Sequence, residues 1–571
     1  MRIRYALAAL VALFALLTLL DRFVVFEMLV RRTAVPLLLA VLVALAAIAT
    51  GALLRRTLRV DAALDLLIGY PAFGVLAFLV GTIRVSPATM LPLVIAGAIG
   101  GGWLLLARGF GEESVRHEPV PISWPAFAVG LVLACGFGVA QAPPSSLDEL
   151  AYHLAIPQTW VQEGRAIELP LNSHSYFPLG IESADLPLLA IAGPIDGGVA
   201  VHLLHLLAAL ATTALILRSS RSWLVTAAIV TTPALAVTAG WALVEWPLVG
   251  LFVALWMLLE KEDIAGASAA TAAGLLTKYT FAPFALVAWI VKRRMPHWTA
   301  LVGLLFYARN ALLTLNPFAP FFSQDAPHVS GFRELALADY IFDGLFLDEA
   351  LGASIVILPV FATGAVAIAA ALLALGLFFL GPSSRILVPF LAVGAASSAD
   401  AFRSRALRIV IAMAIVLQTF FVVWITGRSG VFPMLAGAVS EEEFLVAQRP
   451  AQGDIHWLNG VLPERSRTLV VGLNETYWFT RPVRGGGNFD GPRISRYLDM
   501  PTPEALRARL HADGITHVAI ITTPVKTADA GKREERETRL SAGAQKMLAL
   551  TLDRYAANVA SKGNATLFTL E

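Results

Sequence analysis

The sequence has one cysteine, few charges and no block of basic residues, and each of these scarcities excludes a kind of structure or partner. Cys135 is the single cysteine in 571 residues, so the chain forms no intrachain disulfide. Charged residues make up 15% of the chain, against roughly 25% in soluble domains. The formal net charge is only +2, which leaves no cationic surface to neutralise nucleic-acid phosphates. The composition therefore argues against a soluble protein and against a nucleic-acid partner.

What the chain has in abundance is apolar sequence, which accounts for 57% of its residues. Runs of roughly 17–25 apolar residues are long enough to cross a bilayer as helices. Such runs, with some shorter ones bounded by charge, recur from Tyr5 to Thr426 and predict about 13–15 transmembrane helices. We therefore expect an α-helical polytopic membrane protein.

Basic residues recur in alternate loops and predict the orientation of these helices. Examples are Arg55 and Arg56, Arg218 and Arg221, and the run Lys292–Arg294. Loops rich in Lys and Arg face the cytoplasm. The segment around residue 148 is then expected outside, facing the periplasm or its equivalent, with the protein in the inner or plasma membrane.

One apolar run, Leu351–Leu380, is too long for a single crossing and short for two. A single crossing would return the C-terminal region to the cytoplasm. A break at Gly364 or Gly376 would make a hairpin and leave that region outside. The distribution of positive charge favours the hairpin.

Composition divides the chain into three predicted parts. They are N-terminal transmembrane helices (1–123), a transmembrane catalytic module (124–427) with an outer loop (143–198), and a C-terminal soluble domain (428–571). In the last part, apolar strands at 468–472 and 516–521 alternate with helical stretches, which indicates a small α/β domain. A longer helix is expected from Arg533 towards Asn558.

Acids, imidazoles and aromatic rings crowd into the outer loop. The sequence Asp148-Glu149-Leu150-Ala151-Tyr152-His153 is followed by Asn172-Ser173-His174-Ser175-Tyr176-Phe177-Pro178 and then by Glu182. Ionisable residues next to membrane spans are costly and commonly functional. The alternative interpretation is a solvated loop whose charges only mark the interface.

Four further ionisable residues are predicted to reach the same face as Asp148. They are Glu245, Lys278, Arg309 and Arg385. Cations at a membrane face suit a lipid phosphate, because Arg binds phosphate through two donors and Lys binds it as a point charge. A neighbouring carboxylate can accept a proton from an attacking hydroxyl. This set therefore suggests displacement at a sugar C1 with a lipid phosphate as leaving group, although Lys278 alone could simply snorkel to the interface.

The outer loop resembles that of the GT-C glycosyltransferases. The segments that carry the resemblance are Asp148–Gln158, Pro170–Pro178 with Glu182, Gly274–Tyr279, Arg309-Asn310 with Asn316-Pro317, and Arg385 with Pro389. They are most similar to the bacterial branch related to protein O-mannosyltransferases and to the aminoarabinose transferases of lipid A. The resemblance covers about Ala126 to Thr426. About five spans precede the acidic loop here instead of the usual one, and Glu245 stands where an Asp is more typical.

The resemblance implies a polyprenyl-phosphate sugar as donor and an acid of the outer loop as catalytic base. Asp148 is the first candidate for the base and Glu149 the second. Residues assigned to the donor and its lipid phosphate are Lys278, Tyr279, Arg309 and Arg385; those assigned to substrate are His153, His174, Glu182 and Glu245. The loop histidines and acids could hold a divalent cation, but their spacing matches no compact metal motif, and no metal or other cofactor is predicted.

The leading hypothesis is an inverting GT-C-type glycosyltransferase of the cell envelope. It would transfer a hexosyl or pentosyl group to a glycan, lipid or protein acceptor, among membrane lipids. The alternative is a transporter or flippase of a lipid-linked saccharide, which would more typically show inverted repeats and broken helices. A scaffold whose outer domain recruits partners is a third hypothesis. The sequence names neither the sugar nor the acceptor.

Overall fold

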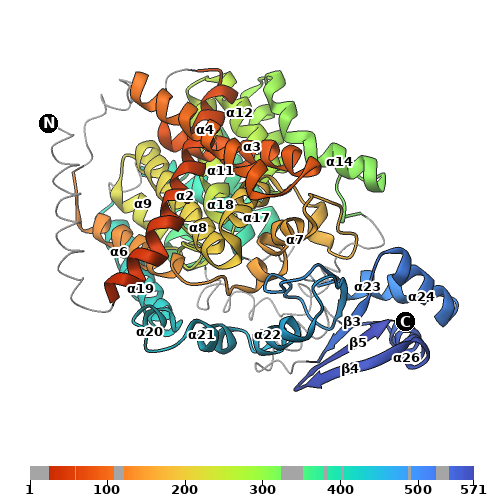
Figure 1. Cartoon of the computed structure of the whole chain (residues 1–571). Helices are drawn as coiled ribbons and strands as arrows, with labels where there is room; N and C mark the ends of the chain where they lie inside the picture. Colours follow the sequence, from red (N-terminus) through yellow and green to blue (C-terminus); the bar gives the residue numbers. More distant parts are fainter. Residues whose placement is uncertain are drawn as a thin grey trace.

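The computed structural model of the chain describes residues 25–57, 60–108, 121–322, 351–378, 384–399, 404–486, 490–522 and 539–570. A body of packed helices occupies most of this part, and a five-stranded sheet lies at its C-terminal end (Figure 1). The apolar run predicted at Tyr5–Leu20 lies outside the described residues.

Five described helices are long and apolar enough to cross a membrane. They are α2 (Val25–Leu54), α3 (Ala62–Ile83), α4 (Pro87–Arg108), α8 (Gly180–Ser220) and α19 (Arg405–Arg428). Shorter apolar helices pack among them: α6 (Trp124–Ala140), α12 (Ile264–Thr277), α13 (Phe281–Lys292), α17 (Ala365–Phe378) and α18 (Ser384–Ala396). The expected class, a helical membrane protein, is confirmed, while the total number of crossings stays a prediction.

The remaining helical segments of this body are short. They are α9 (Trp223–Val230), α10 (Pro233–Ala236), α11 (Glu245–Glu260), η3 (Trp298–Leu304), α14 (Leu305–Thr314), α16 (Ala353–Ile357) and η5 (Leu358–Phe361). The long run predicted to break at Gly364 or Gly376 does so at Gly364, which has a φ of 85° and separates η5 from α17. Glycine adopts a positive φ without the steric cost that a side chain adds.

Helix α8 begins earlier than the sequence predicted. The first span after the outer loop was expected at Val199, but the helix starts at Gly180 and kinks at Gly193 (φ 76°), just before Pro194. Residues 180–190 are all buried. A Cβ on Gly74 would lie 1.7 Å from the Gly180 carbonyl oxygen, so α3 and α8 touch backbone to backbone. The acids near the start of α8 are therefore buried among helices.

Helix α3 separates the basic loops from the polar outer loop. At its N-terminal end, Arg218 contacts Asp61 at 2.5 Å, next to the end of α2. At its C-terminal end, the Ala166 N–H donates to the Gly81 carbonyl at 2.8 Å. The 22 residues of α3 span about 33 Å, close to the thickness of a bilayer's hydrocarbon core. The two kinds of loop therefore lie at opposite ends of a membrane-length helix, as the alternation of positive charge predicts.

The C-terminal part is a small α/β domain, as expected from its sequence. Its helices are α20 (Val431–Leu435), α21 (Glu441–Gln448), α22 (Ala451–Val461), α23 (Gly491–Leu498), α24 (Pro503–Ala512) and α26 (Ala542–Tyr555). Its strands are β1 (Thr468–Val471), β2 (Val483–Arg484), β3 (His517–Ile521), β4 (Ala556–Lys562) and β5 (Ala565–Leu570). The order is β2-β1-β3-β5-β4; β1 runs parallel to β2 and β3, and β5 runs antiparallel to β3 and β4.

The helix expected to run to Asn558 ends at Tyr555 instead. The chain continues as β4 and returns as β5 through Gly563-Asn564, where Gly563 has a φ of 59°. A two-residue turn of this kind is typical of a β-hairpin. The sequence prediction was wrong here because that dipeptide is a hairpin signal, and pairing with β3 then draws both strands into the sheet.

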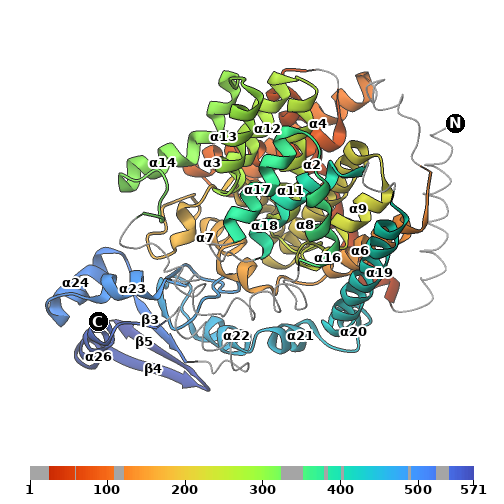
Figure 2. The ribbon, with the colours of Figure 1, turned by 180° about the vertical axis from the view of Figure 1, so that it is seen from behind.

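The C-terminal domain docks onto the outer loop. α20, α21 and α22 lead from α19 beneath the helical body towards the sheet (Figure 2). The Trp478 indole donates to the Pro144 carbonyl at 3.1 Å, and the Thr476 N–H donates to the Leu150 carbonyl at 2.8 Å. Arg467 contacts Glu163 at 2.6 Å. The domain therefore lies on the same side of the helices as Asp148, which is where a hairpin at 351–380 would place it.

Candidate functional site

The polar segment starts after the apolar helix α6, which ends at Ala140, shortly before Pro143-Pro144. Proline lacks the backbone N–H that a continuing helix needs. The chain then forms a single π-helical turn, η1 (Glu149–His153), followed by α7 (Ala155–Glu163) and later by the 3-10 turn η2 (Ser173–Tyr176). π-Helical turns are rare and are often found at functional sites.

Asp148 and Arg385 form an ion pair at the centre of this segment. Arg385 Nη2 donates to Asp148 Oδ2 at 2.9 Å, and both side chains are partly exposed. Arg385 belongs to the first turn of α18. Burial raises the pKa of Asp148, but the charges of Arg385 and His153 outweigh it and hold that pKa below its ordinary value. Asp148 is therefore ionised at neutral pH.

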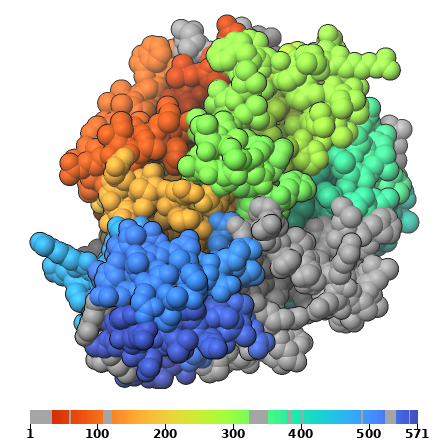
Figure 3. Space-filling model, turned by 90° about the vertical axis from the view of Figure 1, so that its right-hand side faces the viewer, coloured from red at the N-terminus to blue at the C-terminus, as the bar shows by residue number. Residues whose placement is uncertain are grey.

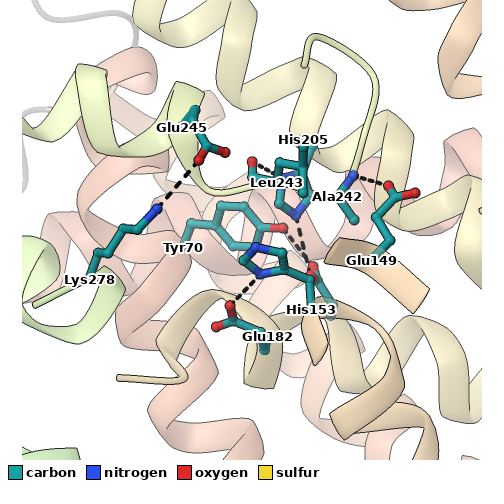
Figure 4. Close-up of polar contacts among 10 residues, drawn as sticks. Tyr70, Glu149, His153, Glu182, His205, Ala242, Leu243, Glu245 and Lys278 are labelled. Carbon is teal, nitrogen blue, oxygen red and sulfur yellow. Dashed lines mark hydrogen bonds and ion pairs between the residues drawn. The ribbon is translucent and has the colours of Figure 1, made fainter. Parts of the chain in front are cut away.

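A second acid–cation pair joins Glu245 and Lys278. Glu245 is the first residue of α11, Lys278 directly follows α12, and the Nζ–Oε1 distance is 3.4 Å (Figure 4). Within the described part of the chain, no group donates to the other oxygen of Glu245, although that oxygen is buried. The charges of Arg385 and His153 also act on Glu245, so the two ion pairs are neighbours.

His153 and Glu182 make a third buried contact. The His153 Nδ1–H donates to Glu182 Oε1 at 2.7 Å (Figure 4). Among the described residues, Glu182 Oε2 is another buried acceptor without a hydrogen-bond partner. Buried polar atoms are normally satisfied, so these two oxygens indicate a place for donors from a ligand.

His174 packs beside this group through its neighbour Tyr152. The two rings stack with their centroids 4.2 Å apart and their planes 17° apart. Burial lowers the pKa of His174 to about 3, more than the nearby Asp148 carboxylate raises it. His174 is therefore neutral at physiological pH.

Glu149 has different partners from its neighbour Asp148. Its Oε1 accepts from His202 Nε2 at 2.8 Å and from the Ala242 N–H at 2.5 Å, and its Oε2 accepts from the Ser146 N–H at 3.1 Å. The side chain is fully buried. Glu149 thus ties the outer loop to α8 and to the turn before α11.

Arg309 and Tyr279 contact the backbone of η2 on another side of the loop. Arg309 Nη1 donates to the Ser175 carbonyl at 2.9 Å, and its guanidinium lies over the Tyr176 ring at 5.9 Å. The Tyr279 hydroxyl lies 3.0 Å from the Tyr176 carbonyl and 2.9 Å from the Ala319 carbonyl. These contacts are with the η2 backbone and with the chain after α14.

The structure thus brings most of the predicted site residues together. We call the following set the charged cluster: Asp148, His153, Glu182, Glu245, Lys278 and Arg385. His174 stacks beside it, whereas Glu149, Tyr279 and Arg309 make their contacts around it. Among the described residues, no group of three or more His, Cys, Asp or Glu side chains is placed to hold a metal ion.

Sequence reasoning missed a buried polar network behind the cluster. The Tyr70 hydroxyl donates to Asp185 Oδ1 at 2.6 Å, and His205 Nε2 lies 3.3 Å from Asp185 Oδ2 (Figure 4 shows Tyr70 and His205). Asp185 follows Glu182 by three residues on α8, which is helical spacing. The outer loop predicted at 143–198 includes both acids, although they belong to the helix that starts at Gly180.

The fold and site together define an α-helical membrane protein with a charged cluster where its helices meet an α/β domain. No protein-family model matches the sequence, and no curated protein matches it. Among solved structures, the chain is similar to the crystal structure of ArnT from Cupriavidus metallidurans bound to undecaprenyl phosphate. The TM-score is 0.46 at 14% sequence identity, and the match covers 78% of this chain and 97% of that one. An activity has to be inferred from the site.

Proposed function

We propose that the protein is a glycosyltransferase that moves a hexosyl or pentosyl group from a polyprenyl-phosphate donor to an acceptor hydroxyl, with inversion at the sugar C1. The observation that carries the proposal is the charged cluster. It holds an ionised carboxylate 2.9 Å from a guanidinium, beside a second acid–cation pair, at one end of the membrane helices.

Lys278 and Arg385 bind the lipid phosphate of the donor in this proposal. The contact between Lys278 and Glu245 is 3.4 Å, longer than the roughly 2.7–2.9 Å of a strong charge-assisted hydrogen bond. The ammonium group therefore has donors to give to a phosphate without losing its carboxylate partner. Arg385 adds a planar set of donors that suits phosphate geometry.

Asp148 acts as the general base. It takes the proton of the acceptor hydroxyl while the hydroxyl oxygen forms its bond to C1. The bond from C1 to the phosphate oxygen breaks, and its electron pair leaves with the polyprenyl phosphate. Lys278 and Arg385 stabilise the negative charge that develops there. Of the two acids predicted as base, Asp148 is favoured, because all three hydrogen bonds of Glu149 are to the protein's own framework.

His153, His174, Glu182 and Glu245 bind the sugar. The unsatisfied oxygens of Glu182 and Glu245 accept hydrogen bonds from sugar hydroxyls. Neutral His174, backed by Tyr152, offers a ring face and a hydrogen bond. The site faces the periplasm or the outside from the inner or plasma membrane, as the alternation of basic loops supports. The acceptor is a glycan, lipid or protein.

The proposal is tested by two measurements on the full chain. Purified protein in lipid nanodiscs is incubated with polyprenyl-phosphate sugars that carry radiolabelled hexoses or pentoses, and the release of polyprenyl phosphate is followed. Membrane glycolipids and glycoproteins from cells lacking the protein are compared with those of the parent by mass spectrometry. We expect release of the lipid phosphate and loss of one sugar modification. Translocation of intact donor without release would instead indicate a flippase.

A further inference from the structure

The turn that leads into α11 places Glu245 in the charged cluster. It spans residues 237–244, between the end of α10 and the start of α11, and we call it the Glu245 turn. The Leu243 carbonyl of this turn, two residues before Glu245, lies 3.1 Å from Nδ1 of His205 on α8 (Figure 4). The backbone that places Glu245 is thus tied to α8 by a side-chain contact.

His205 has an acceptor at each of its ring nitrogens. Besides the contact of Nδ1 with the Leu243 carbonyl, Nε2 lies 3.3 Å from Asp185 Oδ2. Both side chains are buried, with 2% of His205 and 1% of Asp185 exposed. A carbonyl oxygen can only accept, so Nδ1 carries a proton, and the contact at Nε2 then needs a second proton on either the imidazole or the carboxyl group. The pair therefore holds one proton more than a neutral imidazole beside an ionised carboxylate.

Tyr70 completes this buried group from the N-terminal helices. Its hydroxyl donates to Asp185 Oδ1 at 2.6 Å, and its ring meets that of His205 edge-on, with the centroids 5.5 Å apart. Both oxygens of Asp185 are thus engaged. With the shared proton the three side chains carry no net charge. Burial favours that state, because an unpaired charge away from water is costly.

The helix that carries Tyr70 belongs to the packed body of the protein. Helix α3 packs against α8, α11 and α12. On the face shown in Figure 3, the N-terminal segments, in red and orange, lie directly against the green segments of the body. Tyr70 is fully buried within this packing. The N-terminal helices therefore reach the residues that hold the Glu245 turn.

We propose that Tyr70, Asp185 and His205 form a positioning chain for the donor site. Tyr70 orients Asp185, Asp185 holds the His205 ring through the shared proton, and His205 fixes the Glu245 turn. The fixed turn keeps Glu245 at its contact with Lys278. The effect of the chain on donor binding rests on the proposed glycosyl transfer, whereas the order of the turn is measured without it.

Two amide substitutions of His205 separate its two contacts. The amide nitrogen of asparagine can take the place of Nδ1, so His205→Asn keeps a donor for the Leu243 carbonyl. The amide nitrogen of glutamine can take the place of Nε2, so His205→Gln keeps a donor for Asp185 and loses the contact with the turn. The two variants therefore differ in the one contact that the proposal requires.

Hydrogen exchange followed by mass spectrometry, on the full chain in lipid nanodiscs without donor, reports the order of residues 237–245. Loss of one buried hydrogen bond should make exchange there about tenfold faster in His205→Gln, and His205→Asn should restore it towards the parental rate. Thr213→Val is the matched control: it removes a buried hydrogen bond of the same helix, to the Ala209 carbonyl at 2.8 Å, and should leave exchange of the turn unchanged. Equal exchange in the two His205 variants overturns the proposal.

Donor binding measures the consequence for the proposed function. The Kd for a polyprenyl-phosphate sugar should rise about tenfold in His205→Gln and return towards the parental value in His205→Asn. The value of kcat at saturating donor should change little, because Asp148 and Arg385 belong to other segments. Faster exchange with a parental Kd contradicts the link from the turn to the donor. If the parent binds no donor, the glycosyl transfer fails, and the exchange rates still decide the positioning chain.

The shared proton is tested by two variants of Asp185. In Asp185→Asn the amide N–H donates to Nε2 of a neutral imidazole and the amide oxygen accepts from Tyr70, so the chain keeps its contacts without the extra proton. Asp185→Leu has a similar size and keeps neither contact. We expect Asp185→Asn to rescue the exchange rate of the turn and Asp185→Leu to exchange as fast as His205→Gln. Equally fast exchange in both Asp185 variants overturns the assignment of the proton. Parental exchange in both overturns the positioning chain, also where His205→Gln does not fold.

Discussion

Arg385 Nη2 lies 2.9 Å from Asp148 Oδ2, across 237 residues of sequence. The pair joins the outer loop to the first turn of α18. It also affects the protonation state of the proposed base, because burial alone would raise the pKa of Asp148, and the charge of Arg385 together with that of His153 outweighs that effect. The two residues therefore act as one unit in both the fold and the proposed chemistry.

The first prediction concerns Arg385→Ala. Without the guanidinium, burial raises the pKa of Asp148, so the carboxylate becomes protonated at a higher pH. The acidic limb of the profile of kcat/KM against pH should move up by about 1–3 pH units. Arg385→Lys keeps a positive charge and should shift the limb less. An acidic limb unchanged in both variants would show that Asp148 does not govern it.

The second prediction concerns Lys278→Ala. Loss of one charge-assisted hydrogen bond costs about 1.5–3 kcal/mol, so the Kd for a polyprenyl-phosphate sugar should rise about tenfold or more. The substitution also leaves Glu245 without its contact at 3.4 Å. The double variant Lys278→Ala/Glu245→Gln removes that unpaired charge and serves as the control for folding. The double variant should regain stability but not affinity for the donor. If Lys278→Ala bound the donor as tightly as the parent, Lys278 would not belong to the phosphate site.

The third prediction separates Glu149 from its neighbour in sequence. Glu149→Ala breaks a fully buried pair with His202 and should lower the free energy of unfolding by about 3–5 kcal/mol. Glu149→Gln keeps an oxygen that can accept from the Ala242 N–H, so it should cost less. Thermal unfolding in detergent measures both variants. Sugar transfer per folded molecule should stay near parental in Glu149→Gln, and a loss there as large as in Asp148→Asn would assign Glu149 to the chemistry.

The fourth prediction concerns the contact between the C-terminal domain and the outer loop. Asp490 accepts hydrogen bonds from the Ser173 N–H at 3.0 and 3.2 Å, and burial raises its pKa from 3.8 to about 7. The folded state then binds the proton more tightly than the unfolded state. Its stability should fall by up to about 1.4 kcal/mol per pH unit as pH rises between those two pKa values.

Asp490→Asn should remove this fall, because the amide keeps an acceptor for the Ser173 N–H but does not titrate. Asp490 directly precedes α23, and Asp499 is an exposed acid that directly follows it. Asp499→Asn is therefore the matched control and should keep the parental pH dependence of stability. Unfolding curves from pH 4 to 8 measure both variants. If the stability of Asp490→Asn fell with rising pH as steeply as that of the parent, Asp490 would not be the group responsible for the fall.

Local signals were enough to predict some elements of the fold. Helix α24 follows Thr502-Pro503, where the Thr502 side chain caps the helix and Pro503 fills its first turn, as the sequence indicates. The break at Gly364 is likewise local. The start of α8 was missed because burial against α3, which is distant in sequence, decides it. The strand β4 was missed although its hairpin partner β5 is adjacent in sequence, because pairing with the distant strand β3 draws the hairpin into the sheet.

The site, like the fold, has features that the sequence predicted and features that packing between distant segments decides. Residue types and topology predicted that Glu245, Lys278, Arg309 and Arg385 would gather with Asp148 at one membrane face. Arg309 contacts the η2 backbone instead of joining the charged cluster. Which acid pairs with which cation depends on how α11, α12 and α18 pack, and no local pattern encodes that. Asp148 contacts Arg385, whereas Glu149, the first residue of the π-helical turn, contacts His202. The sequence alone therefore left both acids as candidates for the base, whereas their contacts in the structure differ.

The role of Asp148 as base is tested most directly by Asp148→Asn in the assay of sugar transfer. The amide has the size of the carboxylate but cannot take the acceptor's proton. General-base catalysis contributes about a hundred- to ten-thousand-fold, so transfer should fall by that factor while the protein stays folded and the donor stays bound. Near-parental transfer by Asp148→Asn, with donor affinity unchanged, would contradict the account and place the base elsewhere in the charged cluster.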